Sequence, residues 1–105
     1  MQRADIPPAL LADVKNYLNI TWDDEATDEK VRGLIASATV YLDSKGGGAL
    51  DYEGDGMPRT LMLEYARYMR DEALDVFENN YTNMILAMQN ERLVPSSVES
   101  AEPTD

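Results

Sequence analysis

The chain has 105 residues, a formal net charge of −11, and neither cysteine nor histidine. Its length predicts one domain with a single modest core. The missing residue types exclude disulfides, Cys/His zinc sites and Ser-His or Cys-His catalysis by this chain alone. Its excess of carboxylates argues against binding to nucleic-acid phosphates or to an anionic membrane surface. Without a signal-peptide or membrane-span pattern, we expect a protein made in the cytoplasm.

Helical periodicity dominates the first half of the chain. Leu10, Val14 and Leu18 recur at helical spacing after a pair of prolines, which predicts a helix over residues 8–19. A carboxylate-rich segment at 23–29 favours the positive end of the next helix dipole. The second helix is predicted over 27–44, before the Gly46-Gly47-Gly48 stop.

Residues 45–57 hold five of the six glycines and predict a flexible loop with Leu50 and Tyr52 as anchors. A long central third helix is predicted over 58–78, because no breaker follows Pro58 until Asn79.

A fourth helix is predicted over 80–93, ending before a proline, and residues 95–105 read as a disordered acidic tail. The fold class predicted is therefore all-α: a small bundle of about four helices over residues 1–94, followed by the tail.

Two predicted helices carry more apolar surface than one core requires. The third is apolar over more than half of its circumference, so it is either packed on both sides or partly faces another subunit. On the fourth, Leu86 and Leu93 lie off the core stripe, either as ordinary exposed leucines or as a partner contact. The residues we expect at a partner or oligomer interface are Leu86, Leu93, Met62, Tyr65, Leu50 and Tyr52.

The acidic loop has the opening of a calcium site but lacks its end. Asp51, Glu53 and Asp55 occupy the first, third and fifth positions, yet the twelfth, which needs a bidentate Glu, is Met62. We interpret these residues as a solvated acidic loop, and the carboxylates at 23–29 as a solvated helix start. No catalytic, cofactor or metal site is predicted, and we do not expect an enzyme.

The order of these parts resembles a known family. LLADVKNYL at 10–18, WDD at 22–24, DEKV at 28–31, ATVYLD at 38–43, LEYARY at 63–68 and FENNY at 77–81 are similar to the small head-tail connector (adaptor) proteins of long-tailed bacteriophages and prophages of Gram-positive hosts. The resemblance covers about residues 8–94. The order and spacing of these motifs together carry the resemblance.

The resemblance implies a virion neck protein that forms a dodecameric ring between the portal and the stopper or tail-completion proteins. Such a ring surrounds passing DNA without binding it specifically. We expect Asp51, Glu53 and Asp55 to face the channel, where like charge would keep DNA from adhering. Two alternatives stay open: a small acidic helical interaction protein, either a regulator or a nucleic-acid mimic, that binds a basic partner; and a small metal-dependent enzyme that uses carboxylates.

Overall fold

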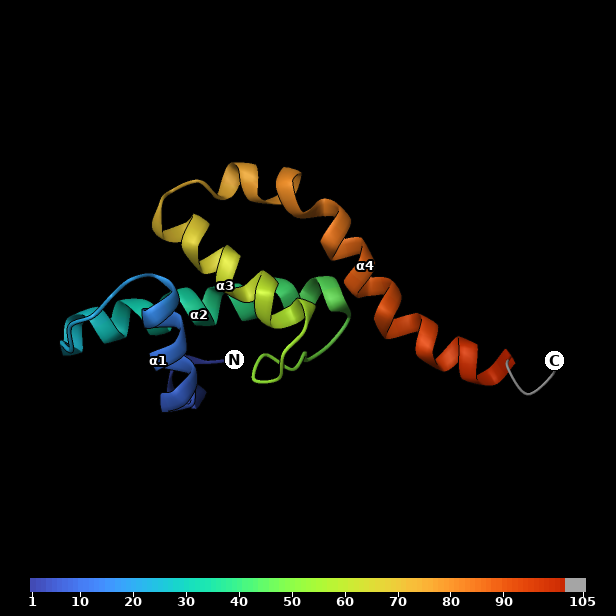
Figure 1. Cartoon of the computed structure of the whole chain (residues 1–105), viewed down its shortest axis with the longest axis horizontal. Coiled ribbons are helices and arrows are strands. Elements are labelled where there is room, and N and C mark those ends of the chain that lie inside the picture. The colour runs from blue at the N-terminus through green and yellow to red at the C-terminus, as the bar shows by residue number, and fades with distance from the viewer. Residues whose placement is uncertain (102–105) are drawn as a thin grey trace.

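The computed structural model describes the backbone of residues 1–101 and the side chains of residues 1–91. A short 3-10 helix, η1 (Arg3–Asp5), precedes four α-helices: α1 (Pro8–Tyr17), α2 (Glu25–Gly46), α3 (Met57–Arg70) and α4 (Leu74–Ala101). The described chain is all-helical, so the predicted fold class is confirmed (Figure 1).

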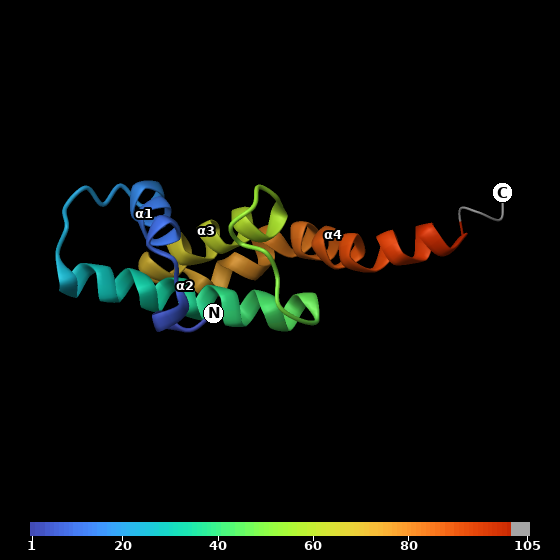
Figure 2. The same ribbon diagram turned by 90° about the horizontal axis from the view of Figure 1, so that it is seen from below.

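Helix α2 is the centre of the bundle, because it packs against η1, α1, α3 and α4. Figure 2 shows it running beneath α1 and α3. The sequence placed the third helix at the centre, and that assignment needs correction. The side chains that α2 buries in the common core are Val31, Ile35, Ala38, Thr39 and Leu42.

Local signals explain where α2 begins and ends. The Asp24 carboxylate accepts the backbone N–H of Thr27 as an N-cap, which satisfies a donor that the first turn leaves unpaired. At the other end Gly47 adopts φ 79°, a left-handed conformation that glycine takes without steric cost. The helix is therefore two residues longer at each end than the predicted range of 27–44.

The predicted third helix of 58–78 is wrong after Arg70, because a turn at 71–73 divides it into two helices. Helix α3 ends at Arg70, and Glu72 takes the left-handed φ of 58°. The N–H of Ala73 donates to Tyr68 O at 2.8 Å and that of Glu72 to Met69 O at 3.1 Å, the hydrogen bonds of a Schellman cap.

Burial of Phe77 explains this turn. In one continuous helix Phe77 would lie about 13 Å along the axis from Tyr68, whereas the turn brings the two ring centroids to 5.6 Å. Phe77 is 1% exposed as a result. The energy of burying an aromatic ring offsets the strain of a left-handed glutamate.

Helix α4 is the longest helix, and it runs beyond the rest of the bundle along an axis 57 Å in extent (Figure 1). It includes Asn79, where a break was predicted, and Pro95, before which the helix was predicted to end. An internal proline removes one backbone hydrogen bond but does not have to end a helix. Residues 95–101, predicted as part of a disordered tail, belong to α4, so that prediction needs correction there; residues 102–105 lie outside the described residues.

Candidate functional site

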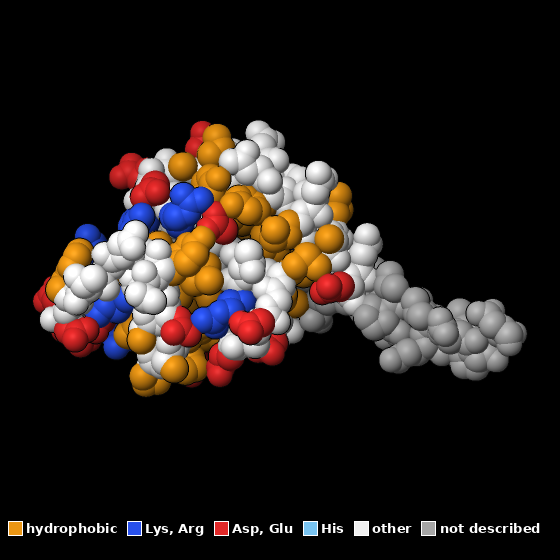
Figure 3. Space-filling model, viewed as in Figure 1, with side chains coloured by type: hydrophobic (Ala, Val, Ile, Leu, Met, Phe, Trp, Pro, Cys, Tyr) orange, Lys and Arg blue, Asp and Glu red, His pale blue; other side chains and the backbone are white. Residues whose placement is uncertain are grey.

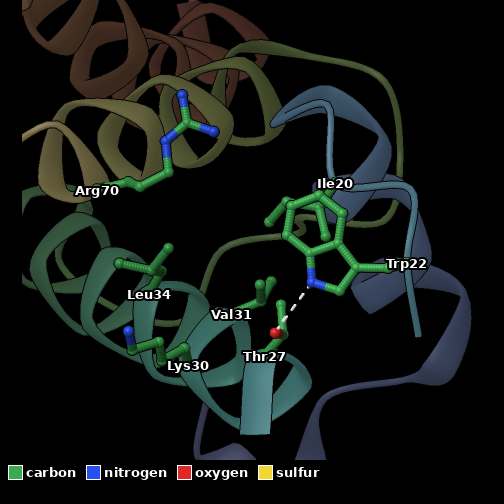
Figure 4. Close-up of a pocket in the computed structure, with 7 residues that line it drawn as sticks. All are labelled: Ile20, Trp22, Thr27, Lys30, Val31, Leu34 and Arg70. Carbon is green, nitrogen blue, oxygen red and sulfur yellow. Dashed lines mark hydrogen bonds between the residues drawn. The ribbon is translucent and has the colours of Figure 1, made fainter. Parts of the chain in front are cut away.

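A pocket of about 400 Å³ beside the start of α2 combines apolar walls with cationic edges. Figure 4 shows Val31 and Leu34 on α2 between Lys30 on one side and Arg70 on the other, with Trp22 closing a third side. The residues that line the pocket are Ile20, Trp22, Thr27, Lys30, Val31, Leu34 and Arg70.

Trp22 is positioned by the cap of α2. Its Nε1–H donates to Thr27 Oγ1 at 3.1 Å, and the Thr27 hydroxyl donates to Asp24 Oδ2 at 3.0 Å. The same Asp24 oxygen accepts the Thr27 N–H. The indole is nevertheless 55% exposed. A tryptophan that is oriented by a hydrogen bond but only half covered offers a rigid apolar surface to a ligand.

The two cations at the pocket edges differ in their bonding. Arg70 Nη1 donates to Leu18 O at 2.7 Å, and its Nε lies 3.2 Å from Asp71 Oδ1. Among residues 1–91, Lys30 is the one lysine or arginine that forms no ion pair. In a chain of net charge −11, this amine is available to a carboxylate from elsewhere.

Lys15 anchors the segment that carries Trp22. Its side chain is buried, and its Nζ lies 2.9 Å from Asp23 Oδ1 and 2.7 Å from Asp28 Oδ1. Hydrogen bonding to Asp28 and then to Asp23 raises the pKa of Lys15, while the bond from Lys15 lowers the pKa of Asp23. The carboxylates predicted as a solvated helix start are therefore partly engaged with a buried lysine.

A second hollow, of about 180 Å³, lies between the end of α2 and the middle of α4. Leu86 forms part of its lining and is 50% exposed. This exposure agrees with the predicted position of Leu86 off the core stripe. Lys45 Nζ lies 3.3 Å from Glu78 Oε2, and Gln89 Nε2 donates to Lys45 O at 2.8 Å. Leu93 belongs to α4, but its side chain lies outside the described residues.

A cluster of five aromatic rings joins α2, α3 and α4. It consists of Phe77 and the four rings that surround it, Tyr41, Tyr65, Tyr68 and Tyr81. Tyr65, an expected interface residue, is half-buried; its ring stacks on Tyr41 at 4.8 Å and meets Phe77 edge-on at 5.1 Å. Burial raises the pKa of Tyr65. Burial and then a hydrogen bond to Glu78 raise the pKa of Tyr41.

Glu64 is a charged side chain that α3 buries. The residue is only 8% exposed. Its Oε1 accepts Arg67 Nη2 at 2.6 Å and the Tyr81 hydroxyl at 2.5 Å. Helical periodicity could not identify such a carboxylate, because its partner Tyr81 belongs to another helix.

The structure corrects two of the expected partner contacts. Met62 is 0% exposed and Tyr52 is 2% exposed, both within the core of the chain itself. The Tyr52 hydroxyl donates to Asp43 Oδ1 at 2.6 Å. Leu50 is half-buried and packs against the same core. Neither Met62 nor Tyr52 is accessible to a partner in this fold: Met62 is a core residue of α3, and Tyr52 is buried because the loop at 45–57 folds back onto α2.

The acidic loop residues lie on the surface. Asp51, Glu53 and Asp55 are all exposed. The Asp51 Oδ1 atom accepts the N–H groups of Glu53 and Gly54, at 3.0 and 3.2 Å, and so closes a local turn. Across the part of the chain that is described, no group of three or more acidic side chains is arranged to hold a metal ion.

The sequence did not indicate the Trp22 pocket, because its walls come from residues 20–34 and from Arg70 at the end of α3. The single tryptophan of the chain was its one visible signal. Within the described residues, no helix is both long and apolar enough to cross a membrane. Comparison with protein-family models, curated proteins and solved structures found no match.

Proposed function

We propose that this chain is a structural connector subunit of a tailed-phage neck, which forms a ring that joins the portal to the stopper or tail-completion proteins. The observation that carries the proposal is the pair of separate hollows along α2. One includes Lys30 and the other Lys45, which are about 22 Å apart at 1.5 Å per residue. A ring requires such a heterologous contact, in which one surface of a subunit meets a different surface of the next.

Exposed apolar side chains support the same proposal. Trp22, Val40 and Leu86 are 55%, 62% and 50% exposed, and they come from three different parts of the fold. Figure 3 shows hydrophobic side chains reaching the surface across one face, with acidic side chains gathered around its margins. In a small domain, several such exposed apolar side chains favour subunit interfaces that bury them over a monomeric state.

In this proposal Asp51, Glu53 and Asp55 line the DNA channel. Their exposure on one loop supports a repulsive, non-binding surface toward the genome. Replacing the three by Asn, Gln and Asn should leave ring formation intact and increase the retention of DNA by the ring. Equal retention would remove the channel assignment while leaving the connector proposal in place.

The connector proposal is tested by assembly. Leu86→Glu should abolish ring formation, measured by sedimentation velocity at rising concentration and with a portal ring from the same genome. Ala87→Glu adds the same charge at an exposed position about 100° around α4 and serves as the matched control. Unchanged assembly of the Leu86 variant, with an intact helical circular dichroism signal, would refute this role of Leu86. Failure of the wild-type chain to form rings in either condition would refute the connector.

The net charge favours a second candidate, an acidic interaction protein that binds a basic partner. Competition with nucleic acid for a basic protein would support it. A chain that forms rings and shows no such competition would exclude it.

A further inference from the structure

The Trp22 pocket and the end of α4 lie at opposite ends of the molecule. Figure 1 shows the α1–α2 connection and the end of α3 at one end of the long axis, and α4 leaving the bundle at the other. That axis is 57 Å in extent. Residues 102–105 span at most about 14 Å when extended. A segment at the end of α4 therefore reaches the pocket of another copy and not its own.

The two ends are complementary in charge. The pocket has Lys30, which has no ion pair among the described residues, and Arg70 at its edges. The segment 94–105, VPSSVESAEPTD, has Glu99, Glu102 and Asp105 and no basic residue. This segment also supplies valines and prolines small enough for apolar walls made by Val31 and Leu34.

We propose that the pocket formed by Trp22, Lys30 and Arg70 binds the acidic segment 94–105 of a second copy of the chain. An apolar side chain of the segment lies against Trp22 and Val31, and a carboxylate pairs with the Lys30 amine. The contact is head-to-tail, so it continues from copy to copy and closes when the rotation between copies permits. This inference rests on the self-association in the proposed function and names one contact within it.

The position of the only tryptophan makes the contact measurable in the full-length chain. A peptide of residues 94–105, which contains no aromatic residue, should change Trp22 fluorescence in a saturable way. Lys30→Glu should weaken peptide binding by about tenfold, because reversal replaces attraction by repulsion at the pocket edge. Asn83→Glu, which adds a carboxylate at an exposed position of α4 that lines neither hollow, should leave the binding constant unchanged and is the control.

A charge swap identifies the segment. A peptide with Glu99 and Glu102 changed to lysine should bind the wild-type chain weakly and the Lys30→Glu chain with restored affinity. A scrambled peptide of equal composition that binds as tightly as the native one would overturn the proposal in favour of unspecific attraction. No change in Trp22 fluorescence would overturn it as well.

The experiments distinguish failure of this contact from failure of the connector proposal. Rings that form normally from Lys30→Glu subunits would overturn this contact and leave the ring in place. Saturable, charge-swappable peptide binding in a chain that never forms rings would support the contact and refute the ring.

Discussion

The hydroxyl of Tyr81 donates a 2.5 Å hydrogen bond to Glu64 Oε1, which joins α4 to a nearly buried carboxylate on α3. Burial alone would raise the pKa of Glu64, but the bonds from Arg67 and Tyr81 outweigh it, and the pKa is lowered. The bond to Glu64, followed by burial, raises the pKa of Tyr81 to about 12. The pair is therefore an ionised contact between the two helices that frame Phe77.

Glu64→Gln should destabilise the fold near neutral pH by about 1–2 kcal/mol, since it removes a charged acceptor from two donors. A carboxyl whose pKa is lowered on folding stabilises the fold above its ordinary value of 4.5 and loses this contribution as the pH falls below it. The difference between wild type and variant, measured by urea unfolding, should shrink from pH 5 to pH 3. Glu91→Gln, at an exposed site, is the control. A difference that stays constant with pH would contradict the assignment.

Glu72→Gly should raise the free energy of unfolding by up to about 1 kcal/mol. Glu72 holds a left-handed φ that strains any residue with a Cβ, while glycine is more flexible in the unfolded chain and so recovers only part of that strain. Glu72→Ala removes the same charge but keeps the strain, so it should be no more stable than wild type. Thermal unfolding that places the two variants at the same midpoint would refute strain at this turn.

Lys15→Met should lower the melting temperature more than Lys30→Met does. The first leaves the buried Asp28 Oδ1 without its ion pair, whereas the lysine of the second is exposed and unpaired among residues 1–91. Adding Asp28→Asn should recover part of the loss. Because the pKa of Lys15 is raised on folding, its contribution is full below 10.5 and is lost as the pH rises beyond that value. Melting curves between pH 9 and 12 should therefore converge for wild type and Lys15→Met.

Tyr52→Phe should release the loop at 45–57. The variant keeps the buried ring but loses the 2.6 Å bond to Asp43, at a cost of about 1 kcal/mol. Amide hydrogen exchange at residues 49–55 should accelerate, with exchange in α2 changing less. Tyr17→Phe, at an exposed ring, should change neither. Loop amides that already exchange as fast as the unfolded chain in wild type would show that Tyr52 does not anchor this segment.

The local signals in the sequence predicted most helix positions. Pro8 and Gly47 mark real helix ends, because proline at the first turn and glycine in the left-handed conformation act within a few residues. The end of α3 had no such signal. It is formed by Glu72, a residue that ordinarily avoids that conformation, and it depends on contacts of Phe77 with rings on other helices.

The surfaces were predictable only in part. Leu86 is exposed as its position off the core stripe implied, while Met62 and Tyr52 are buried. A stripe of apolar residues shows that a helix is covered, but it does not distinguish the chain's own core from a neighbour. The pocket at Trp22 depends on the approach of Arg70, which no periodicity within residues 20–34 indicates.

The unbroken length of helix α2 fixes the distance between the two hollows. Both hollows include side chains of this one helix, which has 22 residues and no break between Glu25 and Gly46. A hydrogen-bonded helix resists stretching, so it holds the two surfaces at a constant spacing whatever the loops do. Any assembly built through both hollows therefore takes its repeat distance from the length of α2.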